Sequence, residues 1–280
     1  MTDCSSAGAA SQKNPGGPLD FRHVVVTGGS RGLGRAMVLG LLRAGARVTA
    51  IASRVSAQSD ETLARAASLP AGERIAMRFG DLRSIEDCRR LAGEAAGFGP
   101  VDMLVNNAAI PMAGAGPRFF EADVGSWHAM VRTNIDGSVL LTTLLVPGML
   151  ARGVGRIVNI STGAATMVRA RYSPYGPSKA FIEAMTRIWA DELAGTGVTA
   201  NVLLPGGAVD TAADVAGAPT PGRQFLDAAV MVPPLLWLAS AESQSHTGLR
   251  LNARLWDEAL PLAQRLAQAD TSRRTEPCIM

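Results

Sequence analysis

The stretch VVVTGGSRGLGRAM, residues 24–37, joins a short run of β-branched residues to a glycine-rich turn and a helical segment. Glycines in this setting are typical of phosphate binding, because the turn admits the ligand and the helix N-terminus offers free N–H groups. Gly28 suits the tight turn, Gly32 a close approach of backbone to a pyrophosphate, and Gly34 packing of helix on strand. The stretch predicts the start of an α/β fold, and a glycine turn without a ligand is the alternative.

The rest of the chain repeats this alternation of apolar strands and amphipathic helices. Continuous apolar strands separated by helices indicate a parallel sheet that is covered on both faces. No internal repeat or linker divides residues 20–258, so the pattern predicts one doubly wound domain. We expect strands within residues 23–27, 46–53, 74–81, 101–109, 155–162, 198–207 and 248–256, and helices within residues 35–45, 60–69, 84–97, 123–150 and 174–193.

The two ends of the chain differ in composition from this domain. Residues 1–20 are small, polar and rich in Gly, Pro and Ser, and they lack the charged and apolar regions of a secretory signal. We interpret them as a disordered leader before a domain at residues 21–258. Residues 259–280 are expected to form a short helix and a polar tail.

Composition narrows the choice of partners and compartment. The net charge is +3 and the arginines are scattered without interleaved aromatic residues, so nucleic acid is not an expected partner. No apolar run reaches about 18 residues, so no membrane span is expected. Cys4, Cys88 and Cys278 lack disulfide or metal-ligand spacing, which predicts a cytoplasmic protein without a metal site.

The segment RYSPYGPSKA, residues 171–180, contains both tyrosines of the chain and one of its two lysines. Lys179 follows Tyr175 by four residues, which places the two side chains on one helix face. A nearby ammonium lowers the pKa of a phenol, normally about 10, so Tyr175 could exchange a proton near neutral pH. This spacing also arises by chance, so by itself it is a weak indication of catalysis.

Five short blocks occur in order along the chain: TGGSRGLG at 27–34, NNAA at 106–109, NIST at 159–162, YGPSK at 175–179 and PGGAVDT at 205–211. Together they resemble the short-chain dehydrogenase/reductase family over residues 22–256. The resemblance implies a Rossmann-type seven-stranded sheet, a nicotinamide cofactor, and hydride transfer between a carbonyl compound and an alcohol. A non-catalytic sensor or scaffold that binds NADP is the alternative, which intact Tyr175, Lys179 and Asn134 disfavour.

The resemblance also assigns catalytic roles. It implies that Tyr175 is the general acid/base, that Lys179 lowers its pKa and binds the nicotinamide ribose, and that Asn134 holds a water. The family's substrate-orienting serine lies thirteen residues before the tyrosine, and here that residue is Thr162. Threonine keeps a hydroxyl that can donate to an oxyanion, with a methyl group that narrows the pocket. Ser161 should point the other way along the strand and is the alternative if the strand ends in a bulge.

The choice of nicotinamide rests on charge at the end of the second strand. Users of NAD commonly carry an acid there to bind the ribose, but this chain has Ala52, Ser53 and then Arg54. Together with Arg31 in the glycine loop, this favours NADP(H) over NAD, although both arginines could be solvated surface charges. By motif and resemblance we expect cofactor contacts from Gly28, Ser30, Arg31, Gly32, Leu33, Gly34, Ser53, Arg54, Asp81, Leu82, Asn107, Tyr175, Lys179, Val209 and Thr211.

The resemblance implies a small carbonyl compound or alcohol as the substrate, and we expect its pocket from residues 110–120, 163–172 and 208–230. The last of these segments is rich in Ala, Gly and Pro and is expected to act as a mobile lid. Arg169 and Arg171 precede the catalytic tyrosine. They could attract an acidic substrate or be ordinary surface charges.

Two helices carry more apolar residues than one buried stripe needs. They are the long helix ending in VLLTTLLVPGML and the helix that follows SPYGPSK. A helix that is apolar on two sides needs a second partner, so we expect a homodimer or homotetramer. The alternative is that residues 257–280 cover the second face in a monomer.

Overall fold

The computed structural model describes residue 19 and residues 22–112, 114, 116–209 and 225–272. Seven strands form one sheet in the order β3-β2-β1-β4-β5-β6-β7, and all neighbouring pairs are parallel. This confirms the expected doubly wound, Rossmann-type single domain. The strands are β1 His23–Thr27, β2 Arg47–Ala52, β3 Ile75–Phe79, β4 Met103–Asn106, β5 Gly155–Ile160, β6 Val198–Leu204 and β7 Arg250–Asn252.

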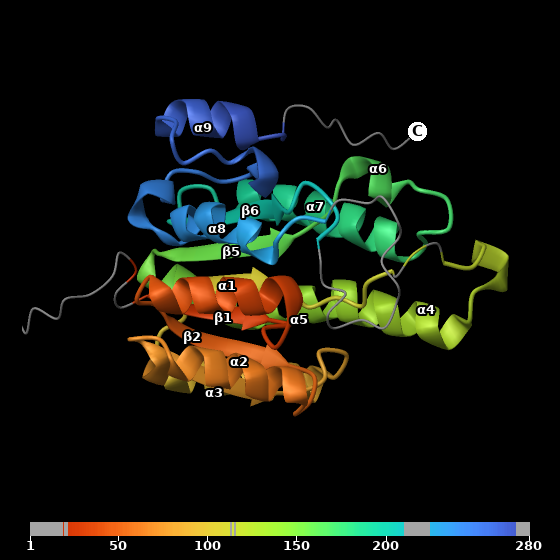
Figure 1. Ribbon diagram of the computed structural model, residues 1–280, viewed down its shortest axis with the longest axis horizontal. Coiled ribbons are helices and arrows are strands. Elements are labelled where there is room, and N and C mark those ends of the chain that lie inside the picture. The colour runs from red at the N-terminus through yellow and green to blue at the C-terminus, as the bar shows by residue number, and fades with distance from the viewer. Residues whose placement is uncertain (1–18, 20–21, 113, 115, 210–224, 273–280) are drawn as a thin grey trace, which may run out of the picture.

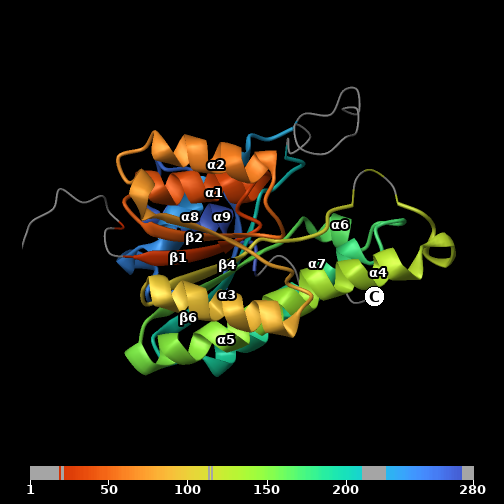
Figure 2. The same cartoon turned by 90° about the horizontal axis from the view of Figure 1, so that it is seen from below.

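Helices cover both faces of the sheet, and alternation along each strand assigns side chains to one face or the other. On β1, Val24 and Val26 join one hydrophobic cluster while Val25 joins the other. The first cluster includes residues of α1, α8 and α9, and the second includes residues of α3, α5 and α7. Figure 2 shows α1 and α2 on one side of the strands and α3 and α5 on the other. The helices are α1 Gly32–Arg43, α2 Ala57–Ala67, α3 Ile85–Phe98, α4 Val124–Val131, α5 Gly137–Arg152, α6 Ala164–Met167, α7 Tyr175–Glu192, α8 Val232–Ala239 and α9 Leu262–Ala269.

The expected long helix is interrupted by a π-helical turn. Residues Arg132–Asp136 form this turn between α4 and α5, and Asn134 lies inside it, almost fully buried. π-Helical turns widen the backbone locally and are frequent at functional sites. The spacing of apolar residues cannot reveal a π-helical turn, because the helical turns on both sides of it keep the α-helical period.

The helix that spans Val124–Arg152 is long and apolar enough to cross a membrane by length and composition. In the structure it packs on the sheet, where Leu141, Leu145 and Met149 are buried in the core cluster. A core helix of a globular protein satisfies the same criterion.

The structure adds α8, which the sequence pattern did not predict. Pro233 and Pro234 interrupt the apolar run, but they lie in the first turn, where a missing N–H costs nothing. The seventh strand is also shorter than expected, since a 3-10 turn follows it. The 3-10 turns are Gly72–Arg74, Phe119–Glu121, Ala228–Met231, Ala241–Ser243 and Ala253–Leu255.

The segment after Asp257 folds back on the domain. Leu262 and Leu266 of α9 pack against the same cluster as α1 and α8, and the Arg265 guanidinium lies 5.1 Å from the centre of the Trp256 ring. After α9, Leu251 and Asp270 form an antiparallel bridge. Figure 1 shows α9 at the edge of the molecule opposite α2 and α3. The described part of this segment thus packs with α1 and α8, whereas α5 and α7 contribute residues to the other cluster.

Candidate active site

A cleft of about 1430 Å³ runs along the carboxyl ends of the strands, from the glycine loop to the start of α7. This is the edge at which doubly wound sheets bind ligands. All but two of the expected catalytic and cofactor-binding residues line this cleft. The expected residues that line it are Gly28, Ser30, Arg31, Gly32, Leu33, Gly34, Ser53, Arg54, Asp81, Leu82, Asn107, Ser161, Thr162, Tyr175, Lys179 and Val209.

The two exceptions have different causes. Asn134 lies behind the cleft wall, where its side-chain oxygen accepts from the Ile110 amide at 2.8 Å and its amide donates to Ser178 Oγ at 3.2 Å. It therefore ties the loop after β4 to the first turn of α7. Thr211, with residues 210–224 of the expected lid, lies outside the described residues.

The glycine loop has a shape that only glycine permits at two positions. Gly28 has a left-handed backbone (φ 66°), and a Cβ atom at Gly34 would collide with the carbonyl oxygen of Gly28. The first turn of α1 carries no acidic residue. The N-terminus of α1 can therefore accept a phosphate without local charge repulsion.

Two buried side chains that we did not predict hold this loop. Arg35 Nη2 and Thr62 Oγ1 both donate to the carbonyl oxygen of Ser30, at 3.1 and 2.7 Å. Thr27 supports the other side of the loop, since its hydroxyl accepts from the backbone amide of Asn107 at 2.9 Å. In the sequence, the position of Arg35 just after the glycines is the only feature that could have indicated its role, and no feature indicated that of Thr62.

The adenine end of the cleft is open and charged. Ser53 and Arg54 are exposed just after β2 ends at Ala52, and Arg31 is exposed in the loop. Of the described residues that line the cleft, Asp81 alone is acidic. A 2′-phosphate would therefore meet positive charge at this end.

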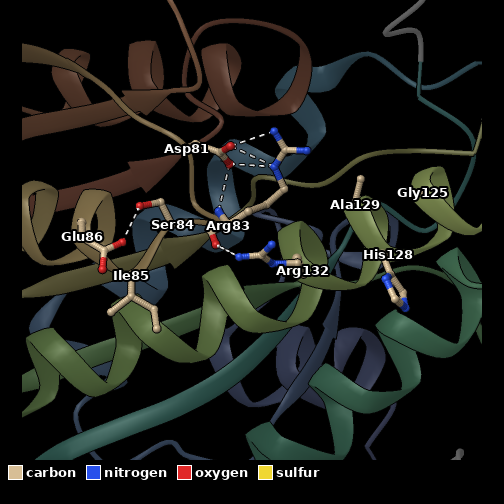
Figure 3. Close-up of a pocket in the computed structure, with 9 residues that line it drawn as sticks. All are labelled: Asp81, Arg83, Ser84, Ile85, Glu86, Gly125, His128, Ala129 and Arg132. Atoms are coloured by element: carbon tan, nitrogen blue, oxygen red, sulfur yellow. Dashed lines mark hydrogen bonds and ion pairs between the residues drawn. The ribbon is translucent and has the colours of Figure 1, made fainter.

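Asp81 does not offer a free carboxylate to a ribose. Arg83 Nη2 donates to Asp81 Oδ2 at 2.7 Å, and this hydrogen bond lowers the pKa of the Asp81 carboxyl. Figure 3 shows the pair on the wall of an adjoining hollow of about 520 Å³, with Arg132 beside the Arg83 backbone. The cation neutralises the acid, so Asp81 adds little repulsion toward a phosphate.

At the other end of the cleft, Tyr175 and Lys179 lie on the first turns of α7. The ammonium of Lys179 donates to the Ile160 carbonyl oxygen at 2.8 Å and lies 5.9 Å from the centre of the Tyr175 ring. Burial lowers the pKa of Lys179 to about 8, and the charge of Glu183 opposes that shift. Lys179 is therefore still mostly protonated at neutral pH.

The expected effect of Lys179 on the tyrosine is not observed. The pKa of Tyr175 is raised, first by burial and then by Tyr172. The ammonium is turned toward the Ile160 carbonyl, so its charge does not outweigh the loss of water around the phenol. The sequence spacing was correct about the shared helix face and wrong about the direction of the pKa shift.

The two hydroxyl-bearing residues at the end of β5 differ in burial and in contacts. Ser161 is 4% exposed, and its hydroxyl donates to Glu183 Oε1 at 2.6 Å. Thr162 is half-buried, and it lines the cleft together with Tyr175. No bulge breaks the β5–β6 register through Ile160, as alternation along the strand requires.

The expected substrate pocket is present in part. Pro111 and Met112 line the cleft from one segment, Thr166 and Tyr172 from the second, and Phe225 from the third. These residues add a mixture of apolar and hydroxyl groups to the lining of the cleft.

The two arginines of this region differ. Arg171 is held by its Nε bond to the Gly116 carbonyl oxygen at 2.7 Å. Arg169 lines the cleft with its guanidinium 5.1 Å from the centre of the Tyr172 ring. The sequence did not distinguish the two arginines, and of the two only Arg169 lines the cleft.

A family model described as short chain dehydrogenase matches residues 22–219. Among curated relatives, a short-chain type dehydrogenase/reductase of Picea abies is 33% identical over 67% of this chain and 71% of its own length. An acetoacetyl-CoA reductase of Shinella zoogloeoides is 34% identical over 66% of this chain and 73% of its own length. Among solved structures, a variant of actinorhodin polyketide ketoreductase with NADPH has a TM-score of 0.73 at 28% identity, covering 84% of this chain and 97% of its own. The chain thus belongs to the short-chain dehydrogenase/reductase family and is an NAD(P)-dependent oxidoreductase.

Proposed function

We propose that the protein interconverts a ketone or aldehyde and an alcohol with NADP(H), and that Tyr175 is the general acid/base. The observation that supports this most strongly is one continuous cleft, with a phosphate-binding loop at one end and Tyr175, Lys179 and Thr162 at the other. The named relatives, an acetoacetyl-CoA reductase and a polyketide ketoreductase, act in the same sense on carbonyl groups.

The residues of the cleft fit a nicotinamide dinucleotide. The glycine turn is so tight that a Cβ atom at Gly34 would collide with the Gly28 carbonyl oxygen, and the helix N-terminus behind it lacks acidic residues. Arg31 and Arg54 would contact a 2′-phosphate, Asn107 the adenine ribose and Lys179 the nicotinamide ribose. When bound, the cofactor supplies or accepts the hydride.

The protein manages the proton and the developing charge. With its pKa raised, the Tyr175 phenol holds its proton at neutral pH and can donate it to a carbonyl oxygen. Thr162 donates a second hydrogen bond to the same oxygen and orients the carbonyl group. Protonated Lys179 stabilises negative charge near the phenol and the ribose. In the reverse direction Tyr175 would accept the proton of the alcohol after losing its own.

A cofactor and substrate screen tests this function. Ketones, aldehydes and alcohols are incubated with NADPH or NADP, and the absorbance of the reduced nicotinamide is followed. We expect turnover with NADPH and slower or no turnover with NADH. Tight NADPH binding without turnover of any compound would instead support the sensor or scaffold, and tighter binding of NADH would overturn the cofactor choice.

We further propose that two copies pair through α5 and α7 into a dimer or tetramer in the cytoplasm. Leu144 and Leu150 on α5 are 37% and 41% exposed, and Phe181 and Ile188 on α7 are 40% and 48% exposed. The described part of the C-terminal segment packs on the other face of the sheet, so it does not cover them. Light scattering tests the assembly by measuring the mass of the particle in solution, which is 29.1 kDa for a monomer and two or four times that mass for a dimer or tetramer. A mass near the monomer value would exclude pairing.

A further inference from the structure

Arg250, the first residue of β7, is a buried cation in the wall of the cleft. It is 8% exposed, and all three nitrogens of its guanidinium have partners. Nε donates to Glu183 Oε2 at 2.8 Å, Nη2 to the Thr162 carbonyl oxygen at 2.9 Å, and Nη1 to Thr271 Oγ1 at 2.9 Å. One side chain thus joins β7, α7, the end of β5 and the C-terminal segment.

Glu183 extends this contact to the second hydroxyl of β5. Its other oxygen accepts from Ser161 Oγ at 2.6 Å. Glu183 follows Lys179 by four residues, so the pair Arg250–Glu183 stands one helical turn behind the catalytic lysine. The Ser161 hydroxyl is thus occupied by the acid, while the backbone of Thr162 is held by the arginine.

The segment after α9 completes the arrangement. Thr271 donates from its backbone amide and its hydroxyl to the Arg250 carbonyl oxygen, at 2.8 and 2.9 Å. Asp270 Oδ1 accepts from the Arg250 amide at 3.1 Å. The C-terminal segment therefore fixes both the backbone and the side chain of Arg250.

We propose that Arg250 and Glu183, closed by Asp270 and Thr271, are positioning residues that fix the end of β5. They hold the Ser161 hydroxyl on Glu183 and leave the Thr162 hydroxyl to face the carbonyl group of the substrate. A catalytic hydroxyl must be held within about 0.5 Å by residues whose own rotamers are locked, and this network locks both neighbours. Its kinetic consequence rests on the proposed function.

Loss of Arg250 would release several groups at once. The Glu183 carboxylate would remain partly buried without its cation, and the Thr162 carbonyl would lose its donor. Partly satisfied buried networks are unfavourable, so the strand end would rearrange to reach water. The Thr162 hydroxyl would then no longer be held in one place.

Arg156 provides a matched control at the start of β5, the strand whose other end carries Ser161 and Thr162. It is 4% exposed, and its guanidinium binds Ser243 Oγ and Gln244 Oε1 at 3.3 and 2.6 Å. Replacing Arg156 by Gln therefore removes an equally buried cation from β5, far from the cleft. Any effect shared by R156Q and R250Q reports general stability, and any effect limited to R250Q reports positioning.

Amide hydrogen exchange tests the proposal without a substrate. The Ser161 amide donates to the Leu203 carbonyl oxygen at 3.0 Å and should be protected in the wild type. We expect faster exchange at residues 161–163 in R250Q, partial recovery in R250K, and no change there in R156Q. Unchanged protection in R250Q, or an equal loss in R156Q, would overturn the proposal. If R250Q does not fold, R250K and Thr271→Val make the same comparison.

Steady-state kinetics then separate positioning from binding. A displacement of about 1 Å at the catalytic hydroxyl costs up to about 10²-fold in rate, so we expect kcat to fall by about that factor in R250Q. NADPH affinity should be unchanged, R250K should recover part of kcat, and R156Q should keep it. Wild-type kcat in folded R250Q would contradict the proposal. A wild type that reduces no carbonyl compound would contradict the proposed function alone, because the exchange pattern would still decide the positioning role.

Discussion

The two ends of the cleft are built from different kinds of groups. At the catalytic end Lys179 is 5% exposed, and its ammonium is held by a backbone carbonyl oxygen. At the adenine end Arg31 and Arg54 are exposed on loops. Buried groups with fixed partners suit the control of a reacting atom, whereas exposed charges attract a ligand through weaker, screened interactions. Substitutions at the catalytic end should lower kcat, and substitutions at the adenine end should raise the Kd for the cofactor.

The largest effect is expected for Tyr175→Phe. The change removes the phenolic hydroxyl and keeps the ring, so kcat should fall by about 10³–10⁴-fold, the contribution of a general acid. NADPH affinity, measured by cofactor fluorescence, should not change. Near-normal turnover would remove Tyr175 from the mechanism.

Lys179→Met should affect both ends. We expect kcat to fall by roughly 10³-fold and NADPH to bind more weakly, because the ammonium is proposed to assist proton transfer and to bind the ribose.

The stability of the protein gives a second test of Lys179. The folded-state pKa of Lys179, about 8, lies below its ordinary value of 10.5, so the folded state loses its proton first as pH rises. The free energy of unfolding of the wild type should therefore rise between these pH values relative to Lys179→Met, as urea melts would show. A constant difference would contradict the pKa shift.

Thr162→Ala should lower kcat by about 10²–10³-fold, the loss expected for one oxyanion donor. Thr162→Ser keeps the hydroxyl and should be tolerated. Ser161→Ala is the matched control on the neighbouring residue, and it should leave the rate almost unchanged because its hydroxyl faces Glu183. The reverse ranking would move the role to Ser161.

At the adenine end, replacing Arg31 and Arg54 together by Gln should weaken NADPH binding by about tenfold, as expected for exposed charges. NADH binding and kcat at saturating NADPH should not change. Titrations of both cofactors against both proteins measure the effect, and high salt should reduce it in the wild type. Equal loss of affinity for NADH would mean that the arginines do not recognise the 2′-phosphate.

The smallest effect is expected for Arg169→Gln. Among the described residues that line the cleft beyond Tyr175, Arg169 is a cation without an acidic partner, so it should favour substrates with a carboxylate. For matched keto acid and neutral ketone substrates, kcat/KM should fall about fivefold for the acid alone. Arg169→Lys should retain the preference. An equal change for both substrates would make Arg169 a surface charge.

Local chemistry explains what the sequence predicts well. The glycine loop, the strands and the Tyr175–Lys179 spacing are each set by backbone geometry over a few residues, so they can be read directly. The positioning network cannot, because Arg250 meets Glu183 and Thr162 across 67 and 88 residues of chain. The pKa of Tyr175 was misjudged for a related reason. Spacing reveals a neighbouring charge, but burial depends on the packed fold.

The scarcity of lysine gives the protein a built-in chemical reporter. The chain has two lysines, Lys13 before the described domain and Lys179 in the cleft. An amine reacts only when deprotonated, and Lys179 reaches that state at an unusually low pH because its pKa is about 8. Acylation by a small amine-selective reagent, followed by peptide mass spectrometry, should therefore report on Lys179 separately from other amines. A ligand that covers the ammonium would slow the labelling, so the same reaction could rank cofactors and inhibitors without any assay of turnover.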